Sequence, residues 1–398
     1  MGDTILDKEQ RQQTALLQPS RRSAVDAFIA MDVMAAANRR EADGGRVIHM
    51  EVGQPGAPAP KRALDAAREA LVHGRFGYTE ACGIPGLRSA IANHYRLTYG
   101  QDVPVSRVVA TTGSSAGFNL AFLAAFDPGD RIALTAPGYP AYRNILKALG
   151  LEPVEIEVGP ETRWALTAEH IERAHREKPL KGVLVASPAN PTGTMMTPET
   201  LQALIAACED LGLWFVSDEI YHGLVYAGRQ ETALRHTQNA IVINSFSKYY
   251  CMTGWRIGWM VVPEVLVRPI ERLAQNLYIS PPYLSQVAAT AAFEAREELE
   301  AVKAGYAANR NLLLKRLPAI GFDELLPVDG AFYVYASVRR FSNDSHDFAT
   351  RMLQEAGIAA TPGADFDHGR GHRYIRFSFA GRNDEMGEAM DRMENWLK

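Results

Sequence analysis

A lysine placed directly after an apolar segment is the first candidate for chemistry in this chain. Lys248 ends the sequence Ser-Phe-Ser-Lys at residues 245–248, which follows the apolar residues 240–244. A lysine amine with its ordinary pKa of roughly 10.4 is protonated at neutral pH, so a nucleophilic lysine needs burial or a cationic neighbour. The apolar segment would bury the amine, while Ser245, Ser247 and Arg256 offer donors suited to a phosphate. The pattern predicts a lysine held for Schiff base chemistry beside a phosphate.

Polar side chains also follow three other short apolar runs, at residues 107–111, 182–186 and 213–217. The polar residues that follow them are the loop 113–116, Asn190, Asp218 and Tyr221. Apolar runs of about five residues that alternate with helical patterns indicate a buried parallel sheet, and ligands collect at the carboxyl ends of its strands. The sequence therefore predicts that these residues and Lys248 meet in one crevice.

The loop at Gly113, Ser114 and Ser115 opens an apolar helical stretch. Backbone N–H groups and the positive end of a helix dipole make such a loop a phosphate site. We therefore expect these three residues to bind the same phosphate as the serines near Lys248.

The remaining candidates suit an aromatic ring. Asp218 can pair with a protonated ring nitrogen, and Asn190 and Tyr221 can hydrogen-bond a phenolic oxygen. Tyr139 follows another apolar run and offers a flat face for stacking. Phosphate, ring nitrogen, phenolic oxygen and an aldehyde that reacts with Lys248 together describe pyridoxal 5′-phosphate.

Four of these segments resemble the motifs of class I/II aminotransferases. They are Ser-Pro-Ala-Asn-Pro-Thr-Gly at 187–193, Ser-Asp-Glu-Ile-Tyr at 217–221, Ser-Phe-Ser-Lys at 245–248 and Gly-Trp-Arg-Ile-Gly at 254–258. The resemblance extends from about Ser23 to Lys398. It implies the α/β architecture of fold type I pyridoxal phosphate enzymes, in which a large domain has a mostly parallel central sheet flanked by helices and a smaller domain is α+β.

The resemblance also implies an activity and residue roles. The enzyme would move an amino group from an L-amino acid to a 2-oxo acid by a ping-pong mechanism through a Lys248 aldimine, and Asp218 would keep the ring nitrogen protonated. Arg376 would bind the substrate α-carboxylate, near the backbone of Gly53 and the side chain of Asn190. Tyr78 would reach the phosphate of a neighbouring subunit, which implies a homodimer with shared active sites.

The change of pattern along the chain predicts its domains. We expect a flexible extension at 1–23, a segment at 24–60 that packs with the small domain, a large cofactor domain at 61–285, and a linker helix with the small domain at 286–398. One long helix is expected at 286–317, strands near 330–337 and 374–379, and helices around 346–356 and 383–397.

Composition narrows the class of protein. The 398 residues are 47% hydrophobic and carry a net charge of −4 without a basic stripe, so no nucleic acid partner is expected. The longest apolar stretch, 116–126, is shorter than the roughly 20 residues that span a bilayer, so no membrane partner is expected. Three widely spaced cysteines indicate neither disulfides nor zinc and fit the cytoplasm. The sequence His-Gly-Arg-Gly-His at 368–372 is more typical of a loop than of a metal site.

The cofactor motifs leave the reaction open between two enzyme classes. A carbon–sulfur β-lyase or an aminocyclopropane carboxylate synthase shares all of them, and only the substrate pocket separates these enzymes from an aminotransferase. A non-enzymatic regulator on the same scaffold would need an added DNA-binding domain, for which about 20 preceding residues are too few.

The substrate side chain is expected to lie between residues 27–30 and residues 276–283. Neither segment contains an arginine that could pair with a second carboxylate, although Arg21, Arg22 or Lys147 could reach in. An apolar pocket does not stabilise a desolvated charge. The sequence therefore predicts a neutral or apolar donor in preference to aspartate.

Overall fold

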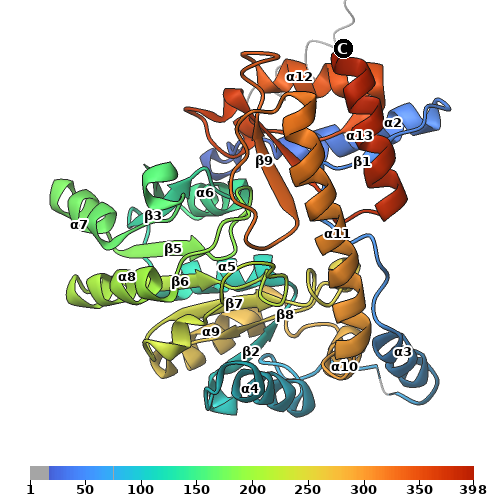
Figure 1. The fold of residues 1–398 in the computed structure, drawn as a ribbon. Coiled ribbons are helices and arrows are strands. Elements are labelled where there is room, and N and C mark those ends of the chain that lie inside the picture. Colours follow the sequence, from blue (N-terminus) through green and yellow to red (C-terminus); the bar gives the residue numbers. More distant parts are fainter. Residues whose placement is uncertain (1–17, 75) are drawn as a thin grey trace, which may run out of the picture.

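The computed structural model describes residues 18–74 and 76–398, and its largest element is a seven-stranded sheet (Figure 1). In spatial order the strands are β2 (Val108–Thr111), β8 (Gly258–Val261), β7 (Ile241–Ser245), β6 (Trp214–Asp218), β5 (Gly182–Ala186), β3 (Arg131–Ala136) and β4 (Glu152–Glu157). Strand β8 is antiparallel to both of its neighbours, and all other neighbouring pairs are parallel. Six strands therefore end at the same edge of the sheet.

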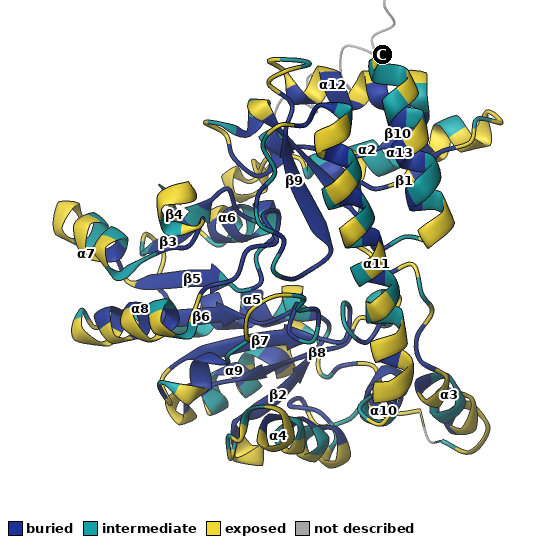
Figure 2. Cartoon of the chain, viewed as in Figure 1, coloured by how far each residue is buried: buried dark blue, intermediate teal, exposed yellow. Residues whose placement is uncertain are grey.

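Both faces of this sheet are covered, which explains the continuous apolar runs of its strands. In β5, Val183 and Val185 belong to one buried core, and Leu184 between them belongs to another. The first core includes residues of α3 (Lys61–His73), α4 (Pro85–Tyr99), α7 (Ala168–Glu177), α8 (Pro198–Asp210) and α10 (Tyr283–Ala292). The second includes residues of α5 (Ser114–Ala125), α6 (Pro140–Ala148) and α9 (Glu264–Leu277). Figure 2 shows the strands as buried and the outer faces of the helices as exposed.

A second group of elements packs around its own core beside the sheet. An antiparallel sheet contains β9 (Tyr333–Ser337), β11 (Thr361–Pro362) and β12 (Tyr374–Ser378), and β1 (Ile48–His49) pairs in parallel with β10 (Ile358–Ala359). The helices of this group are α2 (Ile29–Ala42), α11 (Arg296–Ile320), α12 (Ser345–Arg351), which continues as a π-helix at Met352–Ala356, and α13 (Asn383–Leu397). The carboxylate of Asp365 accepts hydrogen bonds from the N–H groups of Ile29 and Ala30, both at 3.2 Å. The amino-terminal segment is thus attached to residues near the end of the chain.

The long helix expected at 286–317 is wrong in one respect, because the structure has two helices there. Helix α10 ends at Ala292 and α11 begins at Arg296. Between them, the ring of Phe293 packs 5.2 Å from that of Phe246 and 5.3 Å from that of Tyr250. This packing favours a turn over a continuous helix. Figure 1 shows α11 running from the sheet to the second group of elements.

Other expectations on organisation have different outcomes. The domain boundaries stay a prediction. Of the extension expected at 1–23, residues 1–17 lie outside the described residues. The described part of this extension contains a short 3-10 helix at Arg21–Ser23. In the two described ranges, no helix is both apolar and long enough to cross a bilayer.

Candidate active site

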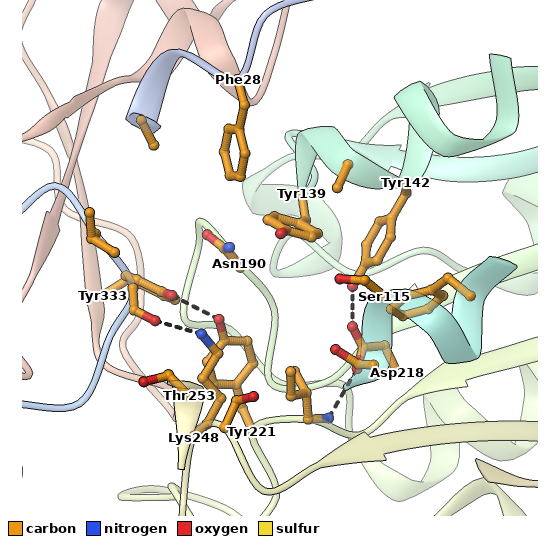
Figure 3. A pocket seen from close by; sticks show the side chains of 18 of the residues that line it. Phe28, Ser115, Tyr139, Tyr142, Asn190, Asp218, Tyr221, Lys248, Thr253 and Tyr333 are labelled. Atoms are coloured by element: carbon orange, nitrogen blue, oxygen red, sulfur yellow. Dashed lines mark hydrogen bonds between the residues drawn. The ribbon is translucent and has the colours of Figure 1, made fainter. Parts of the chain in front are cut away.

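A cavity of about 230 Å³ lies where the strand ends of the large sheet face the second group of elements. Eleven of the residues predicted from the sequence line it: Gly53, Ser114, Ser115, Tyr139, Asn190, Asp218, Tyr221, Ser247, Lys248, Arg256 and Arg376. Three of the predicted residues, Gly113, Ser245 and Tyr78, do not line it. Figure 3 shows side chains from both groups of elements pointing into this space.

Lys248 lies at the bottom of the cavity, three residues after the end of β7. Its Nζ donates a hydrogen bond to the carbonyl oxygen of Gly53 at 2.5 Å and lies 5.9 Å from the ring centroid of Tyr221. Burial lowers the pKa of Lys248 to about 8; the charge of Arg376 acts in the same direction and that of Asp218 opposes it. A sizeable fraction of the amine is therefore neutral near pH 8, as a nucleophile requires.

Asp218 ends β6, and its carboxylate is buried with few partners. Tyr142 donates a hydrogen bond to Oδ2, and the N–H of Ile220 donates to Oδ1 at 3.0 Å. Burial raises the pKa of Asp218 to about 6, while these two hydrogen bonds and the charge of Lys248 lower it. Asp218 is thus mostly ionised at neutral pH although it is buried, and a cationic ring nitrogen would be a suitable partner for it.

Tyr142 is a site residue that the sequence analysis did not identify. It lies in α6, three residues after Tyr139, so both face the cavity. The two rings pack edge to face with centroids 5.2 Å apart, and Phe28 packs against Tyr139 at 5.7 Å (Figure 3). The three-residue spacing of the tyrosines after an apolar run was the available signal. Tyr139 itself keeps a partly exposed ring beside the cavity, as stacking requires.

Arg376 lies in β12 with 2% of its surface exposed. Its Nη1 donates to Oδ1 of Asn190 at 2.8 Å, and its Nη2 donates to the carbonyl oxygen of Glu51 and to Oγ1 of Thr361. The guanidinium carbon lies 4.4 Å from the ring centroid of Tyr333. Nε has no hydrogen-bond partner. A fixed, buried guanidinium with an unpartnered donor is suited to a carboxylate.

Gly53 and Tyr333 meet at one wall of the cavity. A Cβ atom at position 53 would overlap the hydroxyl of Tyr333, so only glycine fits there. That hydroxyl lies 2.8 Å from the hydroxyl of Tyr221. Tyr333, in β9, was also missed by the sequence analysis. Its role depends on contacts with Gly53 and Tyr221, which are far from it in the sequence.

The predicted phosphate site is the amino-terminal end of α5. Gly113 caps this helix with a φ of +79°, a conformation that favours glycine, and a Cβ there would overlap the guanidinium of Arg256. Ser114 and Ser115 form the first turn of the helix, whose N–H groups have no partner within it. Helix terminus, hydroxyl groups and Arg256 together suit a phosphate. The buried Asp218 and the Lys248 amine complete a set of donors and acceptors that fits pyridoxal phosphate.

Ser245, the other serine of the predicted phosphate site, does not line the cavity, and its contact with the phosphate stays a prediction. It is buried, its hydroxyl donates a hydrogen bond to the carbonyl oxygen of Ile257 at 3.1 Å, and its Oγ lies 2.9 Å from Oγ of Ser247. Ser247, two residues after the end of β7, lines the cavity. Ser245 therefore supports Ser247.

Tyr78 and the segment 276–283 lie together outside the cavity. The N–H of Thr79 donates to Oγ of Ser280 at 3.2 Å, and the ring of Phe76 packs 5.8 Å from that of Tyr283. Within one chain, none of residues 276–283 lines the cavity, which differs from the expectation that they form the side-chain pocket. Phe28 and Ala30 of the segment 27–30 do line it, as expected.

The basic residues that could have reached the side-chain pocket do not line it. Lys147 pairs with Asp26 at 3.2 Å, and Arg21 and Arg22 are exposed. Among the described residues, Arg256 and Arg376 are the arginines that line the cavity.

Comparisons with known proteins agree on one family. The model of aminotransferase class I and II matches residues 46–393. A valine–pyruvate aminotransferase from Mycobacterium tuberculosis is 50% identical over 380 residues, which are 94% of this chain and 97% of that protein. A (5-formylfuran-3-yl)methyl phosphate transaminase from Methanocaldococcus jannaschii is 35% identical, with 94% and 97% covered.

Solved structures show the same likeness. The crystal structure of an aminotransferase from Mycobacterium tuberculosis superposes with a TM-score of 0.94 at 50% identity and covers 96% of this chain and 99% of that one. An aspartate aminotransferase from Thermus thermophilus with maleate gives a TM-score of 0.90 at 31% identity, with 95% and 99% covered.

Proposed function

Because the chain belongs to the class I and II aminotransferases, we propose that it binds pyridoxal 5′-phosphate and takes the amino group from a neutral L-amino acid with an apolar side chain. The predicted family, fold class and aminotransferase activity are confirmed. The names of the relatives favour amino transfer between small amino acids and oxo acids over a lyase, a synthase or a regulator. The family as a whole depends on pyridoxal phosphate.

The observation that carries the donor proposal is the composition of the cavity wall. Apart from the residues placed at the cofactor and the α-carboxylate, it consists largely of Phe28, Ala30, Met31, Val52, Phe118, Ala141 and Ile145. A second substrate carboxylate would lose its water there without gaining a cation. Each methylene buried against such a wall contributes about 0.8 kcal/mol. The relative that is 50% identical is called a valine–pyruvate aminotransferase, which agrees with a branched aliphatic donor.

The residues that would hold the cofactor fall into five groups. Ser114, Ser115, Ser247 and Arg256 would hold the phosphate, with Gly113 and Ser245 shaping that end of the site; Asp218 would pair with the ring nitrogen; Asn190 and Tyr221 would hydrogen-bond the phenolic oxygen; Tyr139 would stack on the ring, and Lys248 would bind covalently. When bound, pyridoxal phosphate supplies the carbon to which the amino group attaches and a ring that accepts electrons from the substrate α-carbon.

Residues of the chain itself bind and orient the substrate and move a proton. Arg376 binds the α-carboxylate, and its contacts with Asn190 and Glu51 fix the guanidinium before the substrate enters. Once the substrate amine has displaced it from the cofactor, the Lys248 amine, with its pKa near 8, would take the proton from the substrate α-carbon and pass it to the cofactor carbon that carries the amino group. Tyr142 keeps Asp218 ionised, so that Asp218 balances the positive charge of the ring nitrogen.

A homodimer with shared active sites is part of the same proposal. Phe76, Tyr78, Leu277 and Ile279 are all exposed, Tyr78 to 83%, on two adjacent segments. Exposed apolar residues gathered in one place are typical of a protein interface. A partner that covers them would bring Tyr78 to a second cavity of the same kind. The predicted cytoplasmic location is retained, with support from three buried cysteines that form no disulfide.

A panel of amino donors tests the donor proposal. The cofactor absorbance of the enzyme is followed in single turnovers with valine, leucine, alanine, phenylalanine and aspartate, without an acceptor. We expect the aliphatic and aromatic donors to react with the higher kcat/KM. Aspartate reacting tenfold faster than all of them would overturn the proposal, and release of pyruvate or sulfide without an oxo acid acceptor would indicate a lyase.

A further inference from the structure

A second cavity lies beside the two segments that carry Tyr221 and Lys248. It has a volume of about 800 Å³ and is enclosed by α4, residues 222–230, and the junction of α10 and α11. Tyr221 and Lys248 line the active site, whereas the next residues, His222 and Tyr249, line the second cavity. The two cavities therefore share walls made of the same two segments.

Aromatic side chains form much of the wall of this second cavity. The ring of His94 lies 5.3 Å from that of Phe293 and 5.9 Å from that of Tyr99, and all three rings are only partly buried. Burial lowers the pKa of His94 to about 4, so its ring is neutral at physiological pH. Neutral aromatic faces of this kind pack well against another flat ring.

Charged side chains form another part of the cavity wall. Its charged residues are Arg229, Arg296, Lys303, Glu294 and Glu300. Glu294 pairs with Arg62 at 3.2 Å, and Arg229 lies 3.9 Å from Glu231. Glu300 accepts a hydrogen bond from Tyr249 at 2.7 Å and lies 3.7 Å from Lys303. Within residues 18–74 and 76–398, Arg296 has no acidic side chain at ion-pair distance. A carboxylate would complete this part of the wall.

Hydrogen bonds connect the second cavity with the active site. The hydroxyl of Tyr99 lies 2.7 Å from Nδ1 of His222, and Nε2 of His222 lies 3.0 Å from the carbonyl oxygen of Ser187. Ser187 begins the loop that carries Asn190, which accepts a hydrogen bond from Arg376. A ligand that moves Tyr99 or His222 therefore acts on a residue that lines the active site.

We propose that the second cavity binds a monocarboxylate with an aromatic ring, with the ring against His94 and Phe293 and the carboxylate at Arg296, and that this binding changes turnover at the active site through His222. The proposal is independent of which amino donor the enzyme uses. It needs no covalent step.

Calorimetric titration of the holoenzyme with 3-phenylpropionate tests the binding. Because the probe can also bind at Arg376, two sites per chain are expected. Ala90→Trp, which fills the second cavity from α4, and Arg296→Glu should each weaken one site by about tenfold or more, while Arg376→Ala removes the other.

Lys315→Glu, an exposed charge reversal on the same helix as Arg296, is the matched control and should change neither site. The uncharged 3-phenylpropanol should bind the second cavity at least tenfold more weakly than the acid.

Kinetics separate the two sites and test the coupling. In the active site the probe competes with the donor, and saturating donor removes its effect. From the second cavity the probe should change kcat even at saturating donor, and this change should be absent in Ala90→Trp. A single site per chain that Arg376→Ala abolishes and Ala90→Trp leaves intact would overturn the binding proposal. Two sites without any effect on kcat would overturn the coupling.

Discussion

The hydroxyl of Tyr142 donates a hydrogen bond to Oδ2 of Asp218, and both side chains are buried where α6 meets the end of β6. Burial alone raises the pKa of Asp218, and the phenol opposes that effect. A carboxylate that must pair with a cationic ring nitrogen has to remain ionised. Tyr142 is thus a positioning residue that acts through Asp218.

Replacing Tyr142 with phenylalanine should weaken cofactor binding most at low pH. Loss of a hydrogen bond to a charged group costs about 1.5–3 kcal/mol, so the pKa of Asp218 rises by about one to two units above its value near 6. Protonated Asp218 cannot pair with a protonated ring nitrogen. Absorbance titration of the apoenzyme with pyridoxal phosphate should show affinity reduced about tenfold at pH 6 and much less at pH 9. Tyr95→Phe, at a buried tyrosine outside the site, is the control, and an equal loss at both pH values would contradict this role.

Asp218→Asn should affect the reaction more strongly than it affects binding. Removing one partner of a buried ion pair costs about 3–5 kcal/mol, which corresponds to a rate lower by roughly 10² to 10⁴ if the loss appears in the transition state. Single-turnover absorbance measurements on the loaded variant give this rate. The exposed Asp323→Asn serves as the control. A near-normal rate would show that Asp218 does not support the ring nitrogen.

Borohydride reduction should attach the cofactor permanently to Lys248. The amine has a lowered pKa and faces the cavity, whereas Lys147 nearby is exposed and paired with Asp26. Peptide mapping by mass spectrometry should find the adduct on the peptide with Lys248. Lys248→Ala should yield no adduct and Lys147→Ala the same adduct as the unchanged enzyme. An adduct on any other lysine would refute the assignment.

The pair formed by His49 and Glu51 should make stability depend on alkaline pH. Nδ1 of His49 lies 2.8 Å from the buried carboxylate of Glu51, and its Nε2 lies 3.4 Å from Glu41; the hydrogen bond with Glu51 raises the pKa of His49 to about 9. A folded-state pKa above the unfolded value of roughly 6.5 means that this contribution is complete below pH 6.5 and is lost as the pH rises through 9.

Thermal unfolding of His49→Gln between pH 6 and 10 measures that contribution. The midpoint of the unchanged protein should fall towards that of the variant as the pH passes 9. Lys248, whose folded pKa is lowered, has the opposite dependence, but it is present in both proteins and cancels in the difference. A difference in midpoint that stays constant over this range would rule out the ion pair.

The residues at strand ends could be predicted from the sequence because burial on both faces makes their strands continuous apolar runs. Asp218 and Lys248 follow such runs in β6 and β7, and the sheet brings them together. Strand β8 was not identified, since its four residues begin with a glycine inside a recognised motif. The break before Arg296 depends on the packing of Phe293 against residues distant in sequence.

Side-chain direction was harder to predict than position in the chain. Ser245 and Ser247 are two residues apart and both are predicted phosphate ligands, yet Ser247 lines the cavity whereas Ser245 does not and donates a hydrogen bond to the carbonyl oxygen of Ile257. Tyr333 reaches the site from β9, whose position is set by packing in the core of the second group of elements. Contacts of this kind follow from the tertiary structure, and local pattern carries no signal for them.

A methyl group at Gly53 should damage the site through Tyr333. In Gly53→Ala the Cβ would overlap the Tyr333 hydroxyl, so either this ring or the segment that carries Glu51 and Gly53 must move. That segment accepts hydrogen bonds from Arg376 and Lys248, and a displacement of about 1 Å at such groups can lower kcat/KM by roughly 10². Adding Tyr333→Phe removes the overlapping oxygen but leaves the ring carbon Cζ 2.8 Å from the new methyl group, so activity should recover only in part.

A double-mutant cycle on kcat/KM, with Tyr333→Phe alone as its fourth corner, gives the coupling between the two positions. Gly86→Ala, with no atom within 4 Å of the added methyl, is the matched control. Equal effects of Gly53→Ala with and without the Tyr333 hydroxyl would show that the overlap is relieved elsewhere.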